Sequence, residues 1–323
     1  MCGFVAVLDP DGDVTALRPR VLAQARSLRH RGPDWSGVQA DPHAILAHER
    51  LAIVDVQHGA QPLVSMNGQH VLAVNGEIYN HRELRADFAV DTFRTDSDCE
   101  VLLPLYAAHV DQSPGAWLNR VNGMFAFVLW DRQRNDWLIA RDPIGVIPLY
   151  TGRDAEDRLW VASELKALAQ VCVSVETFPP GCWQSAAMTK PARYYQPTWR
   201  AYSAVEYGPE DPAALRAALE ASVHRHLMSD VPYGVLLSGG LDSSLVVALM
   251  QAQADRSVRT YSIGFSQRAF DEAPFAAEVA RHLGTDHTTL VMGESDVLAM
   301  VPRMPDVYDE PFADSSQLPT CMV

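Results

Sequence analysis

Basic residues are scarce in this sequence and nowhere clustered. The 323 residues include 26 Lys and Arg against 40 Asp and Glu, which gives a formal net charge of −14. Proteins that act on nucleic acids or on anionic membranes carry basic patches, so neither is expected as the main partner. A chain this acidic that binds phosphate must rely on backbone dipoles, a few Arg or Lys side chains, or a metal ion.

Long apolar runs and paired cysteines are also missing. No run reaches the length that spans a bilayer, and residues 1–10 lack the basic start and long apolar core of a signal peptide. The cysteines are odd in number and show no C-x-x-C spacing, so neither a disulfide framework nor a zinc site is expected. They are Cys2, Cys99, Cys172, Cys182 and Cys321. These absences predict a protein of the reducing cytoplasm.

The sequence does have enough apolar residues, 48%, for sizeable cores, and its length suggests about two domains. In the first, residues 2–190, strand-like runs joined by hairpins predominate. The expected strands are 3–8, 43–55 in two pieces around Arg50, 71–79 with a break, 123–130, 136–141, 146–150 and 159–163, and the expected helices are 16–29, 81–88, 98–109 and 164–169. This pattern predicts an α+β fold, an αββα sandwich of two packed sheets with helices outside.

A polar stretch rich in Pro and Gly, residues 191–211, is the expected linker. Beyond it, Asp211 and Pro212 suit the start of a helix, whose apolar face is marked by Leu215, Leu219, Val223 and Leu227. The elements expected next are strands 233–238, 258–264 and 286–291 and helices 242–254, 272–283 (ended by Gly284) and 294–301. Residues 212–323 are therefore expected to form part of an α/β doubly wound parallel sheet, with its ligand at the carboxyl ends of the strands.

Cys2 directly follows the initiator Met1. Its small side chain predicts removal of the methionine, which would leave the thiol and a free α-amine on one residue. An α-amine titrates near pH ~8 and can act as the base for an adjacent thiol. Alternatively, Cys2 is merely a small residue at a frayed end, which is the more usual meaning of Met-Cys alone.

A glycine-rich turn, Ser238-Gly-Gly240, separates the expected strand 234–237 from the expected helix that begins near Asp242. Such a turn points several N–H groups at one spot, and the helix start adds partial positive charge, so the stretch predicts a phosphate site. It lacks the Gly-Lys-Ser/Thr ending of a Walker A loop. The alternative is a structural Gly-Gly turn with Asp242 as the helix cap.

Five motifs occur in one order along the first domain. They are Met1-Cys-Gly, Arg31-Gly-Pro-Asp34, Glu49-Arg-Leu-Ala-Ile-Val-Asp55, Asn75-Gly-Glu-Ile-Tyr-Asn80 and Ser97-Asp-Cys-Glu100. This ordered set resembles the glutaminase domain of the N-terminal-nucleophile (class II) glutamine amidotransferases. Together with the loop at 233–244, the chain resembles the glutamine-hydrolysing asparagine synthetases of the bacterial B type, in which the glutaminase precedes an ATP-pyrophosphatase synthetase domain.

The resemblance implies roles at the first site. Cys2 attacks the side-chain amide of glutamine, and the Asn75 amide and the Gly76 N–H stabilise the oxyanion. The residues implied to bind glutamine are Arg50 (α-carboxylate), Glu77 and Asp98 (α-ammonium), the backbone of Leu51, Ile53 and Val54, and Asn75 and Gly76. Each has a simpler alternative: Arg50 in a surface ion pair, Asn-Gly in a hairpin turn, Asp98 as a helix N-cap. Arg31 and Asp34 are interpreted as ion-paired support for the site.

At the second site, the resemblance implies that ATP and aspartate form an adenylate. The implied ATP-binding residues are Leu237 and Ile263 (adenine), Ser238, Gly239, Gly240, Ser243 and Ser244 (phosphates), and Asp242, which would hold Mg²⁺. Asp314 and Ser315 either face the aspartate or cap a loop.

The chain departs from that family because it stops at Val323, before a second Ser-Gly-x-Gly-x-Asp-Glu motif. We expect a fragment or a truncated product. Glutamine hydrolysis alone, glutamine binding alone, or amidation of another carboxylate stays open, and the sequence allows a homodimer without fixing the oligomeric state.

Overall fold

The computed structural model describes residues 1–200, 208, 211–267, 271–310, 313–314 and 316–322. The chain divides into two compact units, Met1–Gly208 and Pro209–Val323. The domain bounds expected from the sequence, 2–190 and 212–323, stay a prediction. Most of the expected linker, residues 201–207 and 209–210, lies outside the described residues.

The first unit contains two six-stranded sheets whose neighbouring strands are antiparallel. The first sheet has the order β10 (Ser174–Thr177), β8 (Tyr150–Arg153), β9 (Leu159–Ala162), β1 (Gly3–Leu8), β3 (Ala44–Arg50), β2 (Trp35–Ala40). The second has the order β12 (Ala192–Arg193), β11 (Cys182–Ser185), β7 (Asp136–Arg141), β6 (Gly123–Asp131), β5 (His70–Ile78), β4 (Leu63–Val64).

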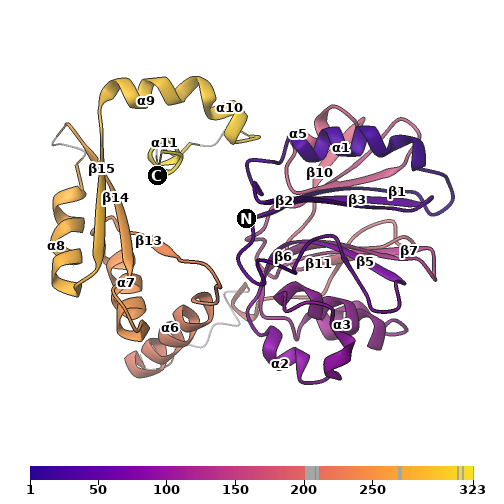
Figure 1. Cartoon of the computed structure of the whole chain (residues 1–323), viewed down its shortest axis with the longest axis horizontal. Helices are drawn as coiled ribbons and strands as arrows, with labels where there is room; N and C mark the ends of the chain where they lie inside the picture. The colour runs from indigo at the N-terminus through magenta and orange to yellow at the C-terminus, as the bar shows by residue number, and fades with distance from the viewer. Residues whose placement is uncertain (201–207, 209–210, 268–270, 311–312, 315, 323) are drawn as a thin grey trace. The chain divides into compact units, whose positions relative to one another are not determined.

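Helices cover the outer face of each sheet, as the first unit in Figure 1 shows. The helices on the first sheet are α1 (Arg18–Arg26, preceded by η1, Thr15–Leu17) and α5 (Lys166–Ala169); those on the second are α2 (His81–Arg85), α3 (Leu102–Ala108, preceded by η3, Asp98–Val101) and α4 (Pro114–Leu118). The described part of the unit also has two short 3-10 turns, η2 (Val90–Thr92) and η4 (Thr198–Arg200).

The strand alternation explains this layering. In β1, Phe4 and Ala6 pack in the layer between the sheets, whereas Val5 and Val7 pack under α1 and α5. Successive strand side chains point to opposite faces, so a fully apolar strand fills both layers at once. The αββα sandwich predicted from the sequence is therefore confirmed. We call the layer that includes Phe4, Leu46, Val71 and Val128 the inter-sheet layer.

Three local expectations were wrong. Residues 70–78 form one continuous strand, β5, with no break at Gly76, and residue 79 lies in a turn. Residues 51–55 are not a strand, because the Arg50 guanidinium binds the carbonyls of residues 54–56 and bends the loop around itself. Residues 146–149 are not a strand either, because the Asp142 carboxylate accepts the N–H groups of residues 144–147 and folds them into a loop.

The second unit is built on a parallel three-stranded sheet in the order β13 (Gly234–Leu236), β14 (Arg259–Phe265), β15 (Asp286–Met292). Its helices are α6 (Pro212–His226), α7 (Leu241–Gln253), α8 (Ala273–Leu283), α9 (Glu294–Met300), η7 (Val301–Arg303), α10 (Met304–Val307) and α11 (Gln317–Thr320). Asp211 caps α6, accepting the N–H groups of Ala213 and Ala214 at 3.0 Å, and Gly284 ends α8 with φ +71°. The predicted strand–helix alternation is confirmed.

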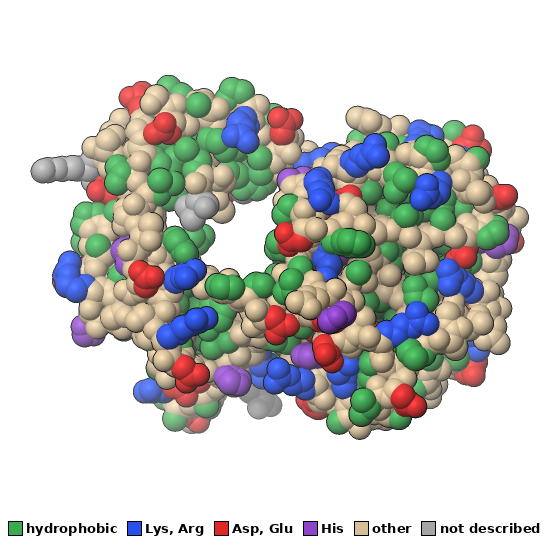
Figure 2. Space-filling model, viewed as in Figure 1, with side chains coloured by type: hydrophobic (Ala, Val, Ile, Leu, Met, Phe, Trp, Pro, Cys, Tyr) green, Lys and Arg blue, Asp and Glu red, His purple; other side chains and the backbone are tan. Residues whose placement is uncertain are grey.

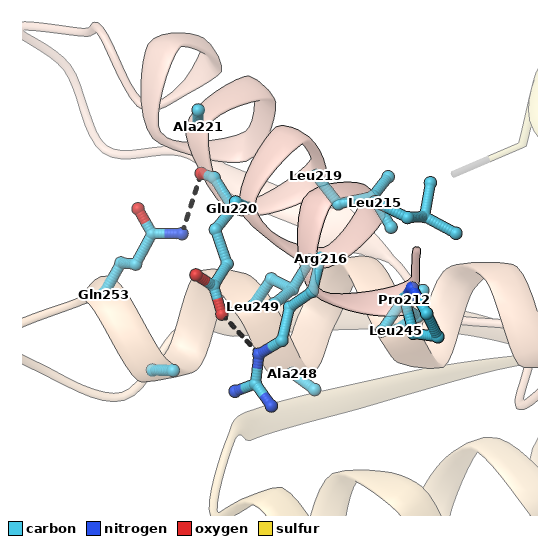
Figure 3. Close-up of a pocket in the computed structure, with 12 residues that line it drawn as sticks. Pro212, Leu215, Arg216, Leu219, Glu220, Ala221, Leu245, Ala248, Leu249 and Gln253 are labelled. Atoms are coloured by element: carbon cyan, nitrogen blue, oxygen red, sulfur yellow. Dashed lines mark hydrogen bonds and ion pairs between the residues drawn. The ribbon is translucent and has the colours of Figure 1, made fainter. Parts of the chain in front are cut away.

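Burial in this unit differs from the expectation. Strand β13 pairs with β14 alone among the described strands, and its Leu236 is 51% exposed. No described residue of α6 is buried; Leu215 and Leu219 line, with Leu245 and Leu249 of α7, a groove of about 960 Å³ (Figure 3). Hydrophobic side chains also gather over α9 and α10 in Figure 2.

No helix in the described ranges has both the length and the apolar character needed to cross a membrane.

Candidate active site

The first cluster of candidate residues lies at one end of the inter-sheet layer. Gly3 of β1 pairs with Glu49 of β3, so the register brings Cys2 beside Arg50. The Leu51 N–H lies 3.4 Å from the Cys2 Sγ, and Sγ lies 3.6 Å from the Leu51 carbonyl. Arg31 Nε donates to the Cys2 carbonyl at 2.8 Å, which fixes the start of the chain. The thiol is therefore held at a defined position rather than on a frayed end.

Burial favours the protonated form of the Cys2 thiol. Burial raises the pKa of Cys2 above its usual value, while the Leu51 hydrogen bond and the N-terminal ammonium act in the opposite direction. Burial likewise lowers the pKa of the Met1 amine. A lowered pKa keeps more of an amine in its neutral, proton-accepting form, whereas the raised pKa of the thiol opposes proton transfer to it. Removal of Met1 would place a free α-amine on Cys2.

Asn75 lies in β5 and faces the inter-sheet layer, where its side chain is completely buried. Neither the amide nitrogen nor the amide oxygen has a hydrogen-bond partner among the described residues. Buried polar groups are normally paired, and exceptions point to a role with a ligand. The amide is thus available to a group that enters the site.

Gly76 continues β5 across from Phe125 of β6, so Asn75-Gly76 is not a hairpin turn and that alternative is wrong. Its φ is +147°, and a Cβ would lie 2.1 Å from the Met124 carbonyl oxygen, so only glycine fits. On one edge of β5, side chains accept the neighbouring backbone N–H groups. The Val74 N–H donates to Gln61 at 2.8 Å, and the Ile78 N–H donates to Asp98 at 2.7 Å. Because alternate residues face the same edge, the Gly76 N–H points there too.

Arg50 is 5% exposed, so the surface ion pair considered as an alternative is wrong. Its guanidinium donates to the carbonyls of Val54 at 2.9 Å, Asp55 at 2.7 Å and Val56 at 3.2 Å. Arginine has five N–H donors, and these three bonds use both Nη2–H groups and one Nη1–H, so a carboxylate would bind at Nε–H or at the second Nη1–H. Leu51, Ile53 and Val54 are half-buried on the same loop.

Glu77 and Asp98 form a buried acidic pair. Burial, and then the negative charge of Asp98, raise the pKa of Glu77 to about 8. Burial also raises the pKa of Asp98, although the Ile78 N–H opposes this. Asp98 lies in the first turn of η3 and turns its carboxylate to Ile78 of β5, so the N-cap alternative is wrong. Two carboxyl groups this close favour one shared proton, or a cation between them.

Several supporting residues were missed or misassigned from the sequence. Arg31 pairs with Glu164 at 2.7 Å, whereas Asp34 accepts the Ala52 N–H at 2.9 Å; each supports the site, but they do not pair with one another. His48 is fully buried with its pKa lowered to about 4 by burial, and its Nε2 lies 2.8 Å from the Val74 carbonyl. Nothing near position 31 or 48 in the sequence signals these long-range partners.

In the second unit, the loop 238–244 is a compact turn at the start of α7. Gly239 has φ +83°, and a Cβ there would lie 2.7 Å from the Ala276 nitrogen, so α8 packs directly on the turn. The hydroxyls of Ser238 and Ser243 are 2.9 Å apart. The buried Ser244 hydroxyl has no partner among the described residues. The N-cap of α7 is Gly240, so the alternative of Asp242 as the cap is wrong.

Three of the expected ATP-binding residues, Leu237, Ser238 and Ile263, line one cavity of about 170 Å³ together with Tyr261 and Pro319. Asp242 stands exposed in the first turn of α7. In the described part of the chain, no three His, Cys, Asp or Glu side chains gather as a metal site. Asp314 accepts the Ser316 N–H at 2.9 Å, and Ser315 lies outside the described residues.

Comparison with known proteins matches both units. The family described as "Glutamine amidotransferase domain" matches residues 1–194, and that described as "Asparagine synthase" matches residues 214–323. Asparagine synthetase B (glutamine-hydrolyzing) of Escherichia coli K12 is 47% identical over 299 residues, 89% of this chain and 53% of the relative. A probable asparagine synthetase (glutamine-hydrolyzing) of Schizosaccharomyces pombe is 47% identical over 265 residues, 81% of this chain and 47% of the relative.

A solved B. subtilis glutamine phosphoribosylpyrophosphate amidotransferase is similar in fold, with a TM-score of 0.51 at 17% identity, covering 96% of this chain and 94% of that one. The chain spans about half the length of the curated relatives it matches. The match over residues 1–194 covers more than half of the chain. The chain therefore belongs to the glutamine amidotransferase domain family, joined to a segment that matches the asparagine synthase family.

Proposed function

We propose that this chain hydrolyses glutamine at Cys2 and that the ammonia serves an ATP-driven conversion of aspartate to asparagine. The observation that carries the first step is the completely buried Asn75 amide without a partner among the described residues, in the same layer as the Cys2 thiol. The second step is supported by the asparagine synthase match over residues 214–323 and by the names of the relatives.

In the proposed hydrolysis, Met1 is first removed and the Cys2 amine takes the thiol proton. Sγ attacks the side-chain carbonyl carbon of glutamine, and the Asn75 amide and the Gly76 N–H donate to the oxyanion. The amine returns its proton to the leaving nitrogen, which departs as ammonia and leaves a thioester. Water then attacks the thioester, releasing glutamate and the thiol.

The head group of glutamine would be held at both of its charges. Arg50 would donate Nε–H or its second Nη1–H to the α-carboxylate. Glu77 and Asp98 would receive the α-ammonium, which lowers the cost of ionising two adjacent buried carboxyl groups. Leu51, Ile53 and Val54 would line the pocket through their backbone groups.

At the second site, Leu237 and Ile263 would contact adenine, and Ser238, Gly239, Gly240, Ser243 and Ser244 the phosphates. The aspartate side-chain carboxylate attacks the α-phosphorus, pyrophosphate leaves, and ammonia then displaces AMP from the acyl carbon. Mg²⁺ binds through one or two carboxylates plus substrate phosphates, so the single Asp242 fits its donor set.

We further propose the cytoplasm as the compartment, since none of the five cysteines is in a disulfide, and a homodimer as the assembly. Nucleic acid and membrane are not among the proposed partners, in line with the formal net charge of −14.

Glutamine hydrolysis alone is the second candidate function. Its supporting observation is the size of the cavity beside the 238–244 loop, about 170 Å³. Pockets that bury a ligand of drug-like size usually hold roughly 300–1,000 Å³. By contrast, all the residues proposed for glutamine hydrolysis belong to the first unit, Met1–Gly208.

The test uses this 323-residue chain with L-glutamine, and measures glutamate and ammonia. We expect Cys2→Ala to abolish glutamate formation, whereas Cys172→Ala, at another half-buried thiol, retains it. Glutamate formation by the Cys2→Ala variant would show that the nucleophile is assigned wrongly. Adding MgATP with aspartate, or with other dicarboxylic acids, then separates the two candidates: asparagine, AMP and pyrophosphate support synthesis, and glutamate alone supports hydrolysis only.

A further inference from the structure

Asp55 is the last residue of the motif that begins at Glu49, and it has no role in the proposed reaction. It is 9% exposed and adopts φ +49°, a left-handed conformation that few residues other than glycine adopt, Asn and Asp being the most frequent. Residues held in such conformations at a site are commonly there because the surrounding bonds require it.

Asp55 forms hydrogen bonds both within its own loop and to a distant segment of the chain. Its carbonyl accepts from Arg50 Nη2 at 2.7 Å and from the Gly59 N–H at 3.0 Å. Its carboxylate accepts from the His58 N–H at 3.1 Å and, through the other oxygen, from the Asp96 N–H at 2.9 Å. One residue thus joins the Arg50 loop to a segment 41 residues further along the chain.

The segment that Asp55 holds leads directly to the other half of the head-group site. Asp96 lies two residues before Asp98, whose carboxylate is fixed to Ile78 of β5 at 2.7 Å. Arg85 holds the intervening Ser97 carbonyl at 2.7 Å. Arg50 and Asp98 therefore sit at the two ends of a short bonded path through Asp55 and Asp96.

We infer that Asp55 is a positioning residue that sets the separation between Arg50 and Asp98, and so selects ligands that carry an α-carboxylate and an α-ammonium together. This inference rests on the proposed glutaminase function, in which Arg50 and Asp98 bind those two groups. Asp55 itself does not touch the substrate. A ligand that carries only one of the two charged groups contacts only Arg50 or only Asp98. Its binding therefore does not depend on the separation between these two residues.

The test compares two competitive inhibitors of glutamine hydrolysis that differ in one group: L-glutamate, which has the α-ammonium, and glutarate, which lacks it. Asn, like Asp, adopts the left-handed conformation, so Asp55→Asn keeps the backbone. One carboxylate oxygen, however, is replaced by an NH₂ group, which cannot accept a hydrogen bond from the N–H group that it faces. We expect the Ki of L-glutamate and the KM of glutamine to rise about tenfold, the scale of one buried group left unpaired, with kcat and the Ki of glutarate unchanged.

Asp154→Asn is the matched control. Asp154 is a buried Asp that accepts loop N–H groups from Glu156 and Arg158 at the far end of β9, where Leu159 pairs with Leu8. It should leave both Ki values unchanged. If Asp55→Asn does not fold, Asp55→Gly takes its place, because glycine adopts positive φ freely and lacks both acceptors.

The outcomes are distinct. Equal loss of L-glutamate and glutarate, or no loss of either, overturns the positioning role while wild-type glutamine hydrolysis stands. Absence of glutamine hydrolysis in the wild-type chain after removal of Met1 overturns the proposed function, and this inference with it.

Discussion

Replacing Asn75 by Ala should separate activity from stability. The amide is fully buried and neither of its polar atoms has a partner among the described residues, so the folded chain carries an unsatisfied group that costs about 1–3 kcal/mol. Ala removes that cost but leaves a small void, which opposes the gain. We expect a net change in unfolding free energy within about 1 kcal/mol, or about 2–4 °C in Tm for a unit of this size.

The effect on hydrolysis should be much larger. Loss of one oxyanion donor typically lowers kcat about 10²–10³-fold. The assay is glutamate release at saturating glutamine, with Tm measured by differential scanning calorimetry.

Asn119→Ala is the control, because its amide nitrogen donates to the Gly115 and Tyr194 carbonyls at 2.8 and 2.9 Å. It should lower Tm and leave kcat unchanged. The reasoning is refuted if Asn75→Ala keeps kcat within about fivefold of wild type, since an oxyanion donor is worth far more. A Tm loss larger than that of Asn119→Ala would show that the Asn75 amide is paired in solution.

Two further predictions concern Glu77 and the 238–244 loop. The folded-state pKa of Glu77, about 8, lies above its ordinary value of 4.5, so the folded chain keeps a proton that the unfolded chain loses. Unfolding free energy should therefore fall as pH rises from 4.5 to 8, and in Glu77→Gln, measured by chemical denaturation at several pH values, this fall should be smaller; an equal fall would contradict the assignment. Gly239→Ala should destabilise more than Gly284→Ala in thermal melts. Both have positive φ, but only at Gly239 would the Cβ strike a neighbour, the Ala276 nitrogen at 2.7 Å, and equal losses would count against that close approach.

The fold could be predicted wherever local pattern and tertiary structure agree. The apolar run 3–8 is β1 because its alternate side chains fill two layers, and Asp211 begins α6 because its carboxylate caps the first turn. The prediction failed at 51–55 and 146–149. Both segments have strand-like composition, but the Arg50 side chain binds the first and the Asp142 carboxylate the second. Strand propensity depends on the residues of the segment itself. It does not include hydrogen bonds from a nearby buried side chain that fold the backbone into a loop.

The site residues stay predictions as to their roles, but their placement can be compared with the expectations. Cys2, Arg50 and Asn75 were chosen by motif order, and the structure places them at the inter-sheet layer. From the local sequence alone, a hairpin turn at Asn75-Gly76 was a sound alternative, since Asn-Gly is the strongest short signal for a tight turn. What excludes it is the pairing of Gly76 with Phe125, a residue far away in the chain.

The sequence by itself determined which chemical groups are present and in what order: an N-terminal thiol, an Asn-Gly pair, an Arg, two acids and a glycine-rich turn. It also determined most strands and helices, because alternation and capping act over a few residues. Only the tertiary structure decided the partners: Arg31 with Glu164, 133 residues apart, and Asp55 with Asp96, 41 residues apart. A hydrogen bond or ion pair depends on a separation of about 3 Å, and that separation between distant segments is set by packing rather than by local preference.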